Sequence, residues 1–184
     1  GHGCPLQAVQ MSVTGSGREL VSVAMGNCLR FNEILAHARA ASEAHPDVDT
    51  IFEIGGQDAK FISLLKGIPV DYAMNDGCSA GTGSFLEEAA SSDLTHPVEQ
   101  IGVSALQADA PLAFGERCAA FINSEIRTAL QGGEDPKNIL AGLVYSIVKN
   151  YLSRVVGTRH IGHTVLLQGG VALNLAVAPA VALL

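Results

Sequence analysis

The feature that most constrains this chain is a buried-strand pattern followed by paired glycines, and it occurs twice. Residues 49–54 (DTIFEI) are rich in β-branched and apolar residues and precede Gly55-Gly56, while residues 164–168 (TVLLQ) precede Gly169-Gly170. Paired glycines at a strand end let the backbone approach a ligand closely, and their amide N–H groups are able to point at an anion. One such turn is equally compatible with a plain connection, whereas two in one chain favour a ligand site.

The other expected elements alternate between strands and helices. Three strand patterns stand close together at 49–54, 59–65 and 70–74, separated by glycine-containing turns, which predicts antiparallel pairing. A further strand is expected at 8–13. Helices are expected at 31–44, 84–91, 97–108, 115–130, 136–152 and from about 171. This order predicts an α/β or α+β domain, with its best candidate boundary at His45-Pro46-Asp47.

Composition excludes several classes of protein. Hydrophobic residues make up 48% and charged residues 16% of the chain, which is enough apolar surface for a packed core. The formal net charge of −7 argues against a basic nucleic-acid-binding face, and 5% aromatic residues without Trp argue against a base-stacking platform. No apolar run reaches the roughly 18–20 residues that span a bilayer, so no membrane partner is expected.

The cysteines and the chain ends indicate the setting of the protein. Four cysteines without a Cys-x-x-Cys pair are few for a secreted disulfide scaffold, so a reducing cytoplasm is expected. The sequence starts with Gly1-His2-Gly3 rather than Met and stops in an apolar, helix-like stretch at 175–184. We therefore expect a segment of a longer protein.

The first Gly-Gly turn carries polar residues suited to phosphate chemistry. Gln57 could orient a water molecule, Asp58 could hold a magnesium ion through water, and Lys60 offers a cation. At the second turn, Gly169-Gly170 precedes an expected helix, and a helix N-terminus suits an anion or a purine lying on the backbone.

Two cysteines stand in positions that favour a reactive thiolate. Cys78 precedes the glycine-rich stretch 81–83, and Cys118 lies in the first turn of an expected helix, where the helix dipole lowers the pKa of a thiol. Each alone is more simply a small buried residue. Two thiolates are half of the four that an iron–sulfur cluster normally takes, and a two-fold dimer would supply the rest.

The remaining candidates have simpler interpretations. Glu87 and Glu88 provide a favourable charge in the first turn of a helix. For His37 we expect a capping or packing role, with a role near a ligand cleft as the second possibility. His160 and His163 are three residues apart, which could suggest a metal, but surface histidines are the simpler interpretation. Cys4 and Cys28 match no ligand position and are expected to be unligated.

Four segments in order resemble the activators of 2-hydroxyacyl-CoA dehydratases, which share the BadF/BadG/BcrA/BcrD-type family with ATPase subunits of benzoyl-CoA reductase. They are Ile54 to Lys60, Met74 to Glu87, Glu116 to Ala119 and Gly169 to Ala172. Residues 14–18 and 33–39 also resemble segments of this family. The match runs from about Thr14 to Asn174.

This resemblance implies an actin/Hsp70/sugar-kinase-like, ribonuclease H-like α/β fold with ATP between two related lobes. Residues 1–46 would be the remainder of the first lobe, and residues 47–184 the second ATPase lobe with a truncated C-terminus. The resemblance further implies ATP or ADP with magnesium, Gln57 and Asp58 in catalysis, and a nucleotide site. The implied nucleotide-binding residues are Gly55, Gly56, Lys60, Gly81, Thr82, Gly83, Gly169, Gly170 and Asn174.

The resemblance also implies a redox role. A homodimer, or a paired lobe of the same chain, would share one [4Fe–4S] cluster on Cys78 and Cys118, and ATP hydrolysis would help to deliver one low-potential electron to a partner 2-hydroxyacyl-CoA dehydratase or related CoA-ester reductase. The alternative is a nucleotide-binding structural or assembly lobe of a large fused protein without a redox centre. A sugar or acyl kinase is a third possibility, for which the sequence offers no evident base.

The chain departs from the family pattern in three places. The Asp-x-Gly-Ser-Thr turn that opens family members and holds the first phosphates is missing, so ATP hydrolysis by these residues alone is not expected. Glu53 stands where smaller activators have Asp, as in long fused activase-like proteins. Leu173 and the tail after it leave the adenine side incomplete.

Overall fold

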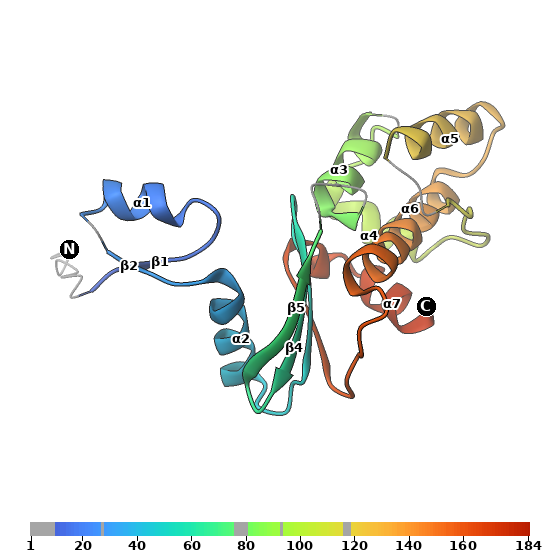
Figure 1. Ribbon diagram of the computed structural model, residues 1–184. Coiled ribbons are helices and arrows are strands. Elements are labelled where there is room, and N and C mark those ends of the chain that lie inside the picture. Colours follow the sequence, from blue (N-terminus) through green and yellow to red (C-terminus); the bar gives the residue numbers. More distant parts are fainter. Residues whose placement is uncertain (1–9, 27, 76–80, 93, 116–118) are drawn as a thin grey trace, which may run out of the picture.

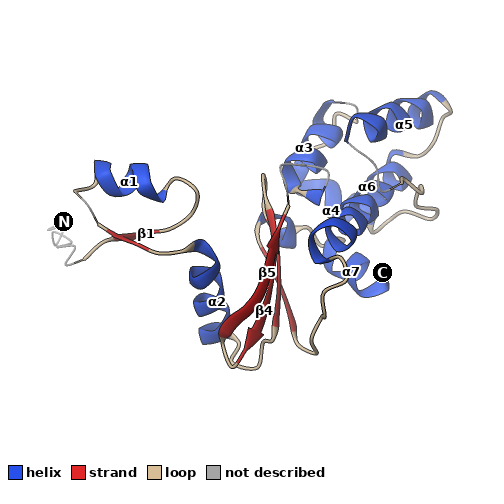
Figure 2. Ribbon diagram, in the orientation of Figure 1, coloured by secondary structure: helices blue, strands red, loops and turns tan. Residues whose placement is uncertain are grey.

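A computed structural model describes residues 10–26, 28–75, 81–92, 94–115 and 119–184 of the chain. A small N-terminal unit is followed by a four-stranded sheet that carries one helix on one face and a group of helices on the other (Figures 1 and 2). The predicted mixed α/β class is confirmed.

The N-terminal unit consists of β1 (Ser12–Val13), α1 (Arg18–Ala24) and β2 (Leu29–Arg30). The two strands pair in parallel, with Ser12 opposite Leu29. Among the described residues of the strand expected at 8–13, Ser12 and Val13 form β1. Sequence analysis did not predict α1 or β2, because seven-residue and two-residue elements carry no measurable periodicity.

The main sheet has the strand order β5-β4-β3-β6. It is formed by β3 (Thr50–Ile54), β4 (Ala59–Leu65), β5 (Ile68–Met74) and β6 (Val165–Gln168). The predicted antiparallel pairing of the first three strands is confirmed, although β5 begins two residues earlier than expected. Strands β3 and β6 pair in parallel, so the two Gly-Gly turns that follow them meet at the same edge of the sheet.

Helix α2 (Glu33–Ala44) covers one face of the sheet. The side chain of Asn32 accepts hydrogen bonds from the amides of Ile34 and Leu35 and caps the helix, which therefore starts two residues later than predicted. Ile34 and other apolar residues of the inner helix face pack on the sheet. This smaller core comprises Ile34, Ala38, Ala41, Val48, Ile51, Ile62 and Leu64.

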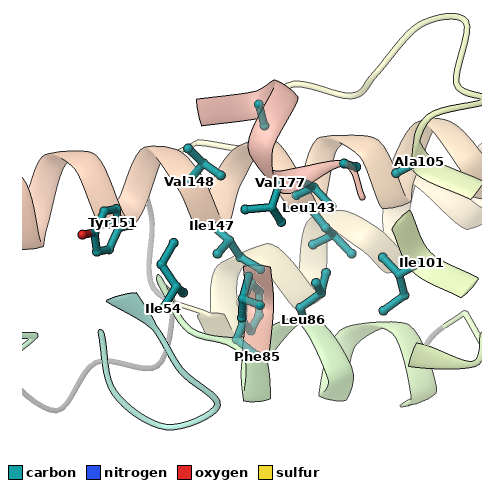
Figure 3. Packing of buried hydrophobic residues seen from close by; sticks show 14 of the residues in the cluster. Ile54, Phe85, Leu86, Ile101, Ala105, Leu143, Ile147, Val148, Tyr151 and Val177 are labelled. Carbon is teal, nitrogen blue, oxygen red and sulfur yellow. The ribbon is translucent and has the colours of Figure 1, made fainter. Parts of the chain in front are cut away.

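The larger core lies on the opposite face, under α6 (Pro136–Tyr151) and its π-helical continuation η3 (Leu152–Val156). Helix α6 begins as predicted, with Asp135 as cap and Pro136 in the first turn. Its buried side chains interlock with those of Ile54, Phe85 and Ile101 (Figure 3). Contrary to the expectation from the sequence, the helical segment 136–156 is long and apolar enough to cross a membrane, but 72% of an 18-residue stretch of it is buried inside the fold.

The helices around α6 are α3 (Gly83–Ser92), α4 (Ile101–Ala105), α5 (Ala119–Gln131) and α7 (Val177–Leu183). Two predictions here were wrong in detail. The expected helix at 97–108 is a 3-10 turn η2 (Val98–Gln100) followed by the short α4. The expected helix from 171 is a 3-10 turn η4 (Gly170–Leu173), which ends at Asn174 because that side chain accepts a hydrogen bond from the Ala176 amide.

Candidate functional site

The first Gly-Gly turn joins β3 to β4, and its two glycines have different environments. The Gly55 amide donates to the Asp58 carbonyl at 2.9 Å, and a Cβ on Gly55 would stand 2.9 Å from that same oxygen. Around a Cβ on Gly56, in contrast, no heavy atom of the described residues lies within 4 Å. Tight packing therefore requires the first glycine, while the second leaves bare backbone facing open space.

The second turn, after β6, repeats this arrangement. Gly169 has a φ of +94°, and a Cβ there would lie 2.6 Å from the carbonyl carbon of Ile54 and closer still to its oxygen. Gly170 has no heavy atom of the described part of the chain within 4 Å of an added Cβ. The second turn thus packs against the end of β3, next to the first.

The N-terminus of α3 packs against both turns. The amide of Gly83 donates to the Gly55 carbonyl at 2.9 Å, and that of Ser84 donates to the Gly56 carbonyl at 2.7 Å. A Cβ on Gly83 would stand 2.8 Å from the side chain of Val171. The three segments therefore form one packed unit, which the sequence motifs predicted separately.

A cavity of about 340 Å³ opens beside this unit. Its lining residues are Gly56, Gly83, Leu86, Glu87, Val98, Glu99, Gly102, Val103, Gly170, Val171, Leu173, Asn174 and Leu175. Four predicted nucleotide-binding residues, Gly56, Gly83, Gly170 and Asn174, are thus brought together. Apolar walls with bare backbone at one side match the make-up of small-molecule sites, which are mostly apolar with a few polar groups.

Two other predicted residues of the α3 segment lie away from the cavity lining. Thr82 is fully buried, with its hydroxyl 3.3 Å from that of Ser84. A Cβ on Gly81 would stand 3.3 Å from the backbone nitrogen of Tyr151, so Gly81 packs on α6.

Sequence reasoning missed the two carboxylates of the cavity, Glu87 and Glu99. For Glu87 a signal existed, because it stands four residues after Gly83 and residues at that spacing share a helix face. Glu99 lies in η2, in a segment predicted as a plain helix, and nothing in the sequence relates it to the glycines. Carboxylates at these places are acceptors for hydroxyl or amino groups of a ligand.

Lys60 lies at the same end of the sheet as the two turns, on the face that α2 covers, and its side chain stands among three carboxylates. Its side chain is 1% exposed, and Nζ stands 2.9 Å from Glu33, 3.0 Å from Glu53 and 3.0 Å from Asp58. Burial alone would lower the pKa of this ammonium, but the hydrogen bonds to Glu33, Asp58 and Glu53 outweigh it and the pKa is raised. Lys60 is therefore a charged, fully paired residue.

Of the two predicted catalytic residues, Asp58 belongs to this cluster and Gln57 precedes it in the turn. The Asp58 side chain, 39% exposed, is held by Lys60. Gln57 lies at the exposed tip of the turn. At the end of β6, the Gln168 amide nitrogen lies 2.7 Å from Nδ1 of His37, so the residue expected to cap or pack a helix contacts the strand before Gly169.

The predicted cluster ligands Cys78 and Cys118, and Cys4, lie outside the described residues. Cys28 is a free, partly buried thiol. Among the residues that the structure describes, no three His, Cys, Asp or Glu side chains group as a metal site, and this includes His160 and His163.

Comparison with known proteins places these features in one family. The sequence profile of the BadF/BadG/BcrA/BcrD ATPase family matches residues 5–183. The chain belongs to this family. Both Gly-Gly turns and the N-terminus of α3 lie within the matched residues.

Individual relatives of this family member are of known role. The (R)-2-hydroxyglutaryl-CoA dehydratase activating ATPase of Acidaminococcus fermentans is 35% identical over 148 residues, which are 79% of this chain and 55% of that protein. The solved activator of the 2-hydroxyisocaproyl-CoA dehydratase from Clostridium difficile, with bound ADPNP, superposes with a TM-score of 0.85 at 30% identity. That match covers 94% of this chain and 63% of the activator. This family member therefore spans less than two thirds of either relative.

A more distant structure agrees in fold alone. The ethanolamine utilization protein EutJ from Carboxydothermus hydrogenoformans superposes with a TM-score of 0.55 at 14% identity. The expected actin/Hsp70-like fold is thus confirmed for this family member.

Proposed function

We propose that this chain is the nucleotide-binding part of an ATP-dependent activator of a 2-hydroxyacyl-CoA dehydratase or related CoA-ester reductase. The observation that carries the proposal is the cavity onto which Gly56 and Gly170 present bare backbone. Both positions have room where a side chain would stand, so the site fits a ligand that lies against peptide groups. Phosphate oxygens are such a ligand.

Different sides of the cavity suit different parts of a nucleotide. We assign the phosphates to the side of Gly55, Gly56, Gly169 and Gly170, and the nucleoside to the apolar side near Asn174. When bound, ATP supplies the free energy of phosphate transfer to water. Gln57 would orient that water and Asp58 would hold the magnesium ion through its hydration shell.

Lys60 acts on this machinery indirectly in our proposal. Its ammonium already binds three carboxylates, so its contribution to nucleotide binding is to fix Asp58 rather than to provide a free positive charge. Gly83 brings α3 onto the first turn, and Gly81 and Thr82 fix the approach of that helix.

For the redox centre we propose Cys78 and Cys118 as ligands of a [4Fe–4S] cluster shared by two copies of the chain. The described residues next to both cysteines contact the same stretch of α6. Gly81 packs on the backbone of Tyr151, and the Ser146 hydroxyl donates to the Gly115 carbonyl at 3.4 Å. These two contacts to α6 are made by Gly81 and Gly115, and a two-fold dimer would complete the four cluster ligands.

The lobes and the partner are proposed from the family relationship, and the cellular location from the cysteine content. Residues 1–46 would belong to the first of two lobes and residues 47–184 to the second, and the protein would act in the cytoplasm. The partner would be a CoA-ester dehydratase or reductase that accepts one electron.

Calorimetric titration of ADP with Mg²⁺ into the chain tests nucleotide binding. We expect binding that Gly56→Ala weakens by about tenfold, because a methyl group would occupy the space of the ligand. Gly17→Ala is the matched control, since Gly17 also has no heavy atom of the described residues within 4 Å of an added Cβ but lies before α1. No ADP binding, or equal loss in both variants, would overturn the proposal.

Anaerobic reconstitution with iron and sulfide tests the redox centre separately. Four irons per two chains, lost in Cys78→Ala and in Cys118→Ala, are expected for the shared cluster. Colourless protein that still binds ADP would instead favour the second candidate, a nucleotide-binding assembly lobe without a redox centre. That candidate rests on the same cavity.

A further inference from the structure

Three polar side chains form a row across the main sheet, one from each of three adjacent strands. Glu53 of β3 pairs in register with Lys60 of β4 and with Gln168 of β6. The row lies directly before both Gly-Gly turns, since Gly55 follows Glu53 by two residues and Gly169 follows Gln168 by one. A polar row at this depth of a sheet requires partners, because buried polar groups are costly when left unpaired.

Helix α2 provides these partners from two positions of one helix face. Glu33 binds Lys60 at 2.9 Å, and His37, one turn later, contacts Gln168 at 2.7 Å. His37 Nε2 lies 3.7 Å from Glu33, so the two are also neighbours along the helix. Ion pairs therefore join Asp58 and Glu33 to Lys60, a hydrogen bond joins His37 to Gln168, and the two groups approach each other to 3.7 Å between Glu33 and His37.

The hydrogen-bonding roles in this chain of contacts follow from chemistry. In this arrangement Gln168 Nε2 donates to His37 Nδ1, which accepts in the tautomer that carries the ring proton on Nε2. His37 Nε2 stands 3.7 Å from the Glu33 carboxylate, whose other partner is Lys60. Each group thus orients the next.

We propose that His37 is a positioning residue that couples the two Gly-Gly turns of the nucleotide site through Gln168 on one side and Glu33 on the other. This inference rests on the proposed function, because the turns need a common ligand. The two turns approach that ligand from different strands, and one helix face contacts the residues beside both. A ligand that orders one turn would therefore find the other turn already held in the position that binds the ligand.

The first experiment measures whether His37 and Gln168 act as a unit. The dissociation constant of Mg-ADP is determined for the chain and for His37→Ala, Gln168→Ala and the double variant. We expect each single variant to bind roughly 3- to 10-fold more weakly and the double variant to be no worse than the weaker single one, as for coupled neighbours. Additive losses, or unchanged affinity in either single variant, would overturn the proposal.

A second pair of variants separates positioning from a merely structural role. Asn places an acceptor where His37 Nδ1 stands, whereas Gln places its amide at the position of Nε2 and loses the Gln168 contact. Asn thus keeps the Gln168 contact but loses the one to Glu33, and Gln does the reverse, so both variants should bind ADP more weakly than the parent although both keep a polar side chain. Parent-like ADP affinity in either variant would contradict the proposal, whatever its melting temperature.

The matched control is His45→Asn, which should leave ADP affinity unchanged because His45 is exposed at the other end of α2. A direct readout is the long-range ¹H–¹⁵N spectrum of the imidazole. It should show His37 with its proton on Nε2, and Gln168→Ala should change the Nδ1 shift. If the parent chain binds no ADP, the proposed function fails. If it binds and His37→Ala binds equally well, only this inference fails.

Discussion

The phenol of Tyr151 donates a 2.9 Å hydrogen bond to the main-chain carbonyl of Lys60, and this bond joins α6 to β4 inside the larger core. Tyr151 is fully buried and packs edge-on against Phe52, with ring centroids 5.3 Å apart. Burial first, and the charge of Glu53 second, raise the pKa of the phenol, so it stays protonated and able to donate.

Tyr151→Phe should therefore lower the free energy of unfolding by about 1–2 kcal/mol, since the ring still packs while one buried hydrogen bond is lost. Urea denaturation followed by circular dichroism measures the difference. Tyr72→Phe is the control, because Tyr72 is 58% exposed on β5 and should change stability by less than about 0.5 kcal/mol. Equal effects of the two variants would show that the Lys60 contact contributes nothing.

Lys60→Met should be much more damaging than its size suggests. It keeps the apolar stem but leaves Glu33, Glu53 and Asp58 close together without their cation, and removing one partner of a buried ionic group costs about 3–5 kcal/mol. Arg39→Met removes the partner of Glu43 in an exposed pair on the same helix and should cost about 0.5 kcal/mol or less. A Lys60→Met protein as stable as the Arg39→Met protein would refute the buried cluster.

The direction in which pH changes the stability that this cluster provides follows from the direction of the Lys60 pKa shift. The folded-state pKa of Lys60 is raised above the ordinary value of 10.5, so its stabilisation is fully present below that pH and declines as the pH rises above it. Stability curves of the parent and Lys60→Met proteins should converge at strongly alkaline pH.

The sequence was most informative where one local pattern decides the structure. The strand, the Gly-Gly turn and the antiparallel hairpins around residues 50–74 follow from short-range alternation and glycine placement. The same holds for α2 and α6, whose caps Asn32 and Asp135 stand in the sequence. The break after η4 was not predicted, because it depends on how Asn174 turns back on the Ala176 amide.

The polar cluster could not be predicted because its members meet through strand register and helix packing. Lys60 and Gln168 become neighbours of Glu53 only when β3 pairs with both β4 and β6, and Glu33 reaches them only when α2 packs on the sheet. For the same reason His37 looked like an ordinary helix residue. The cavity glycines Gly56, Gly83 and Gly170 were among the predicted site residues, whereas Gly102 and the carboxylate of Glu99 were not.

Asp49 should stabilise the connection into β6 in a pH-dependent manner. Its carboxylate accepts hydrogen bonds from the amides of His163, at 2.8 Å, and Thr164, at 3.2 Å. Burial raises the pKa of Asp49, but these bonds and the one from Thr50 outweigh it, so the pKa lies below the ordinary 3.8. The stabilisation is therefore present above that pH and is lost as the pH falls through the folded-state pKa.

The test is Asp49→Ala, which should lower the unfolding free energy by about 1–2 kcal/mol at pH 7 and by progressively less on acidification below pH 4. Asp47→Ala is the control, since Asp47 is an exposed residue of the preceding turn. A cost of Asp49→Ala that stays constant down to pH 2 would contradict a role for the charged carboxylate.

The two glycines of the second turn should respond differently to the same substitution. Gly169→Ala places a methyl group against Ile54 at a φ of +94°, so strain and overpacking should cost about 2–4 kcal/mol of stability. Gly170→Ala meets open space in the described structure and should leave the melting temperature within about 2 °C of the parent. Its effect should instead be on ADP affinity, because Gly170 lines the cavity.

Thermal melts with and without Mg-ADP measure stability and ADP affinity in one experiment. The nucleotide should raise the melting temperature of the parent and of the Gly17→Ala protein, and it should raise that of Gly170→Ala much less. If Gly170→Ala lost stability and kept the full shift with ADP, the second turn would be a structural turn alone and the cavity would not be the nucleotide site.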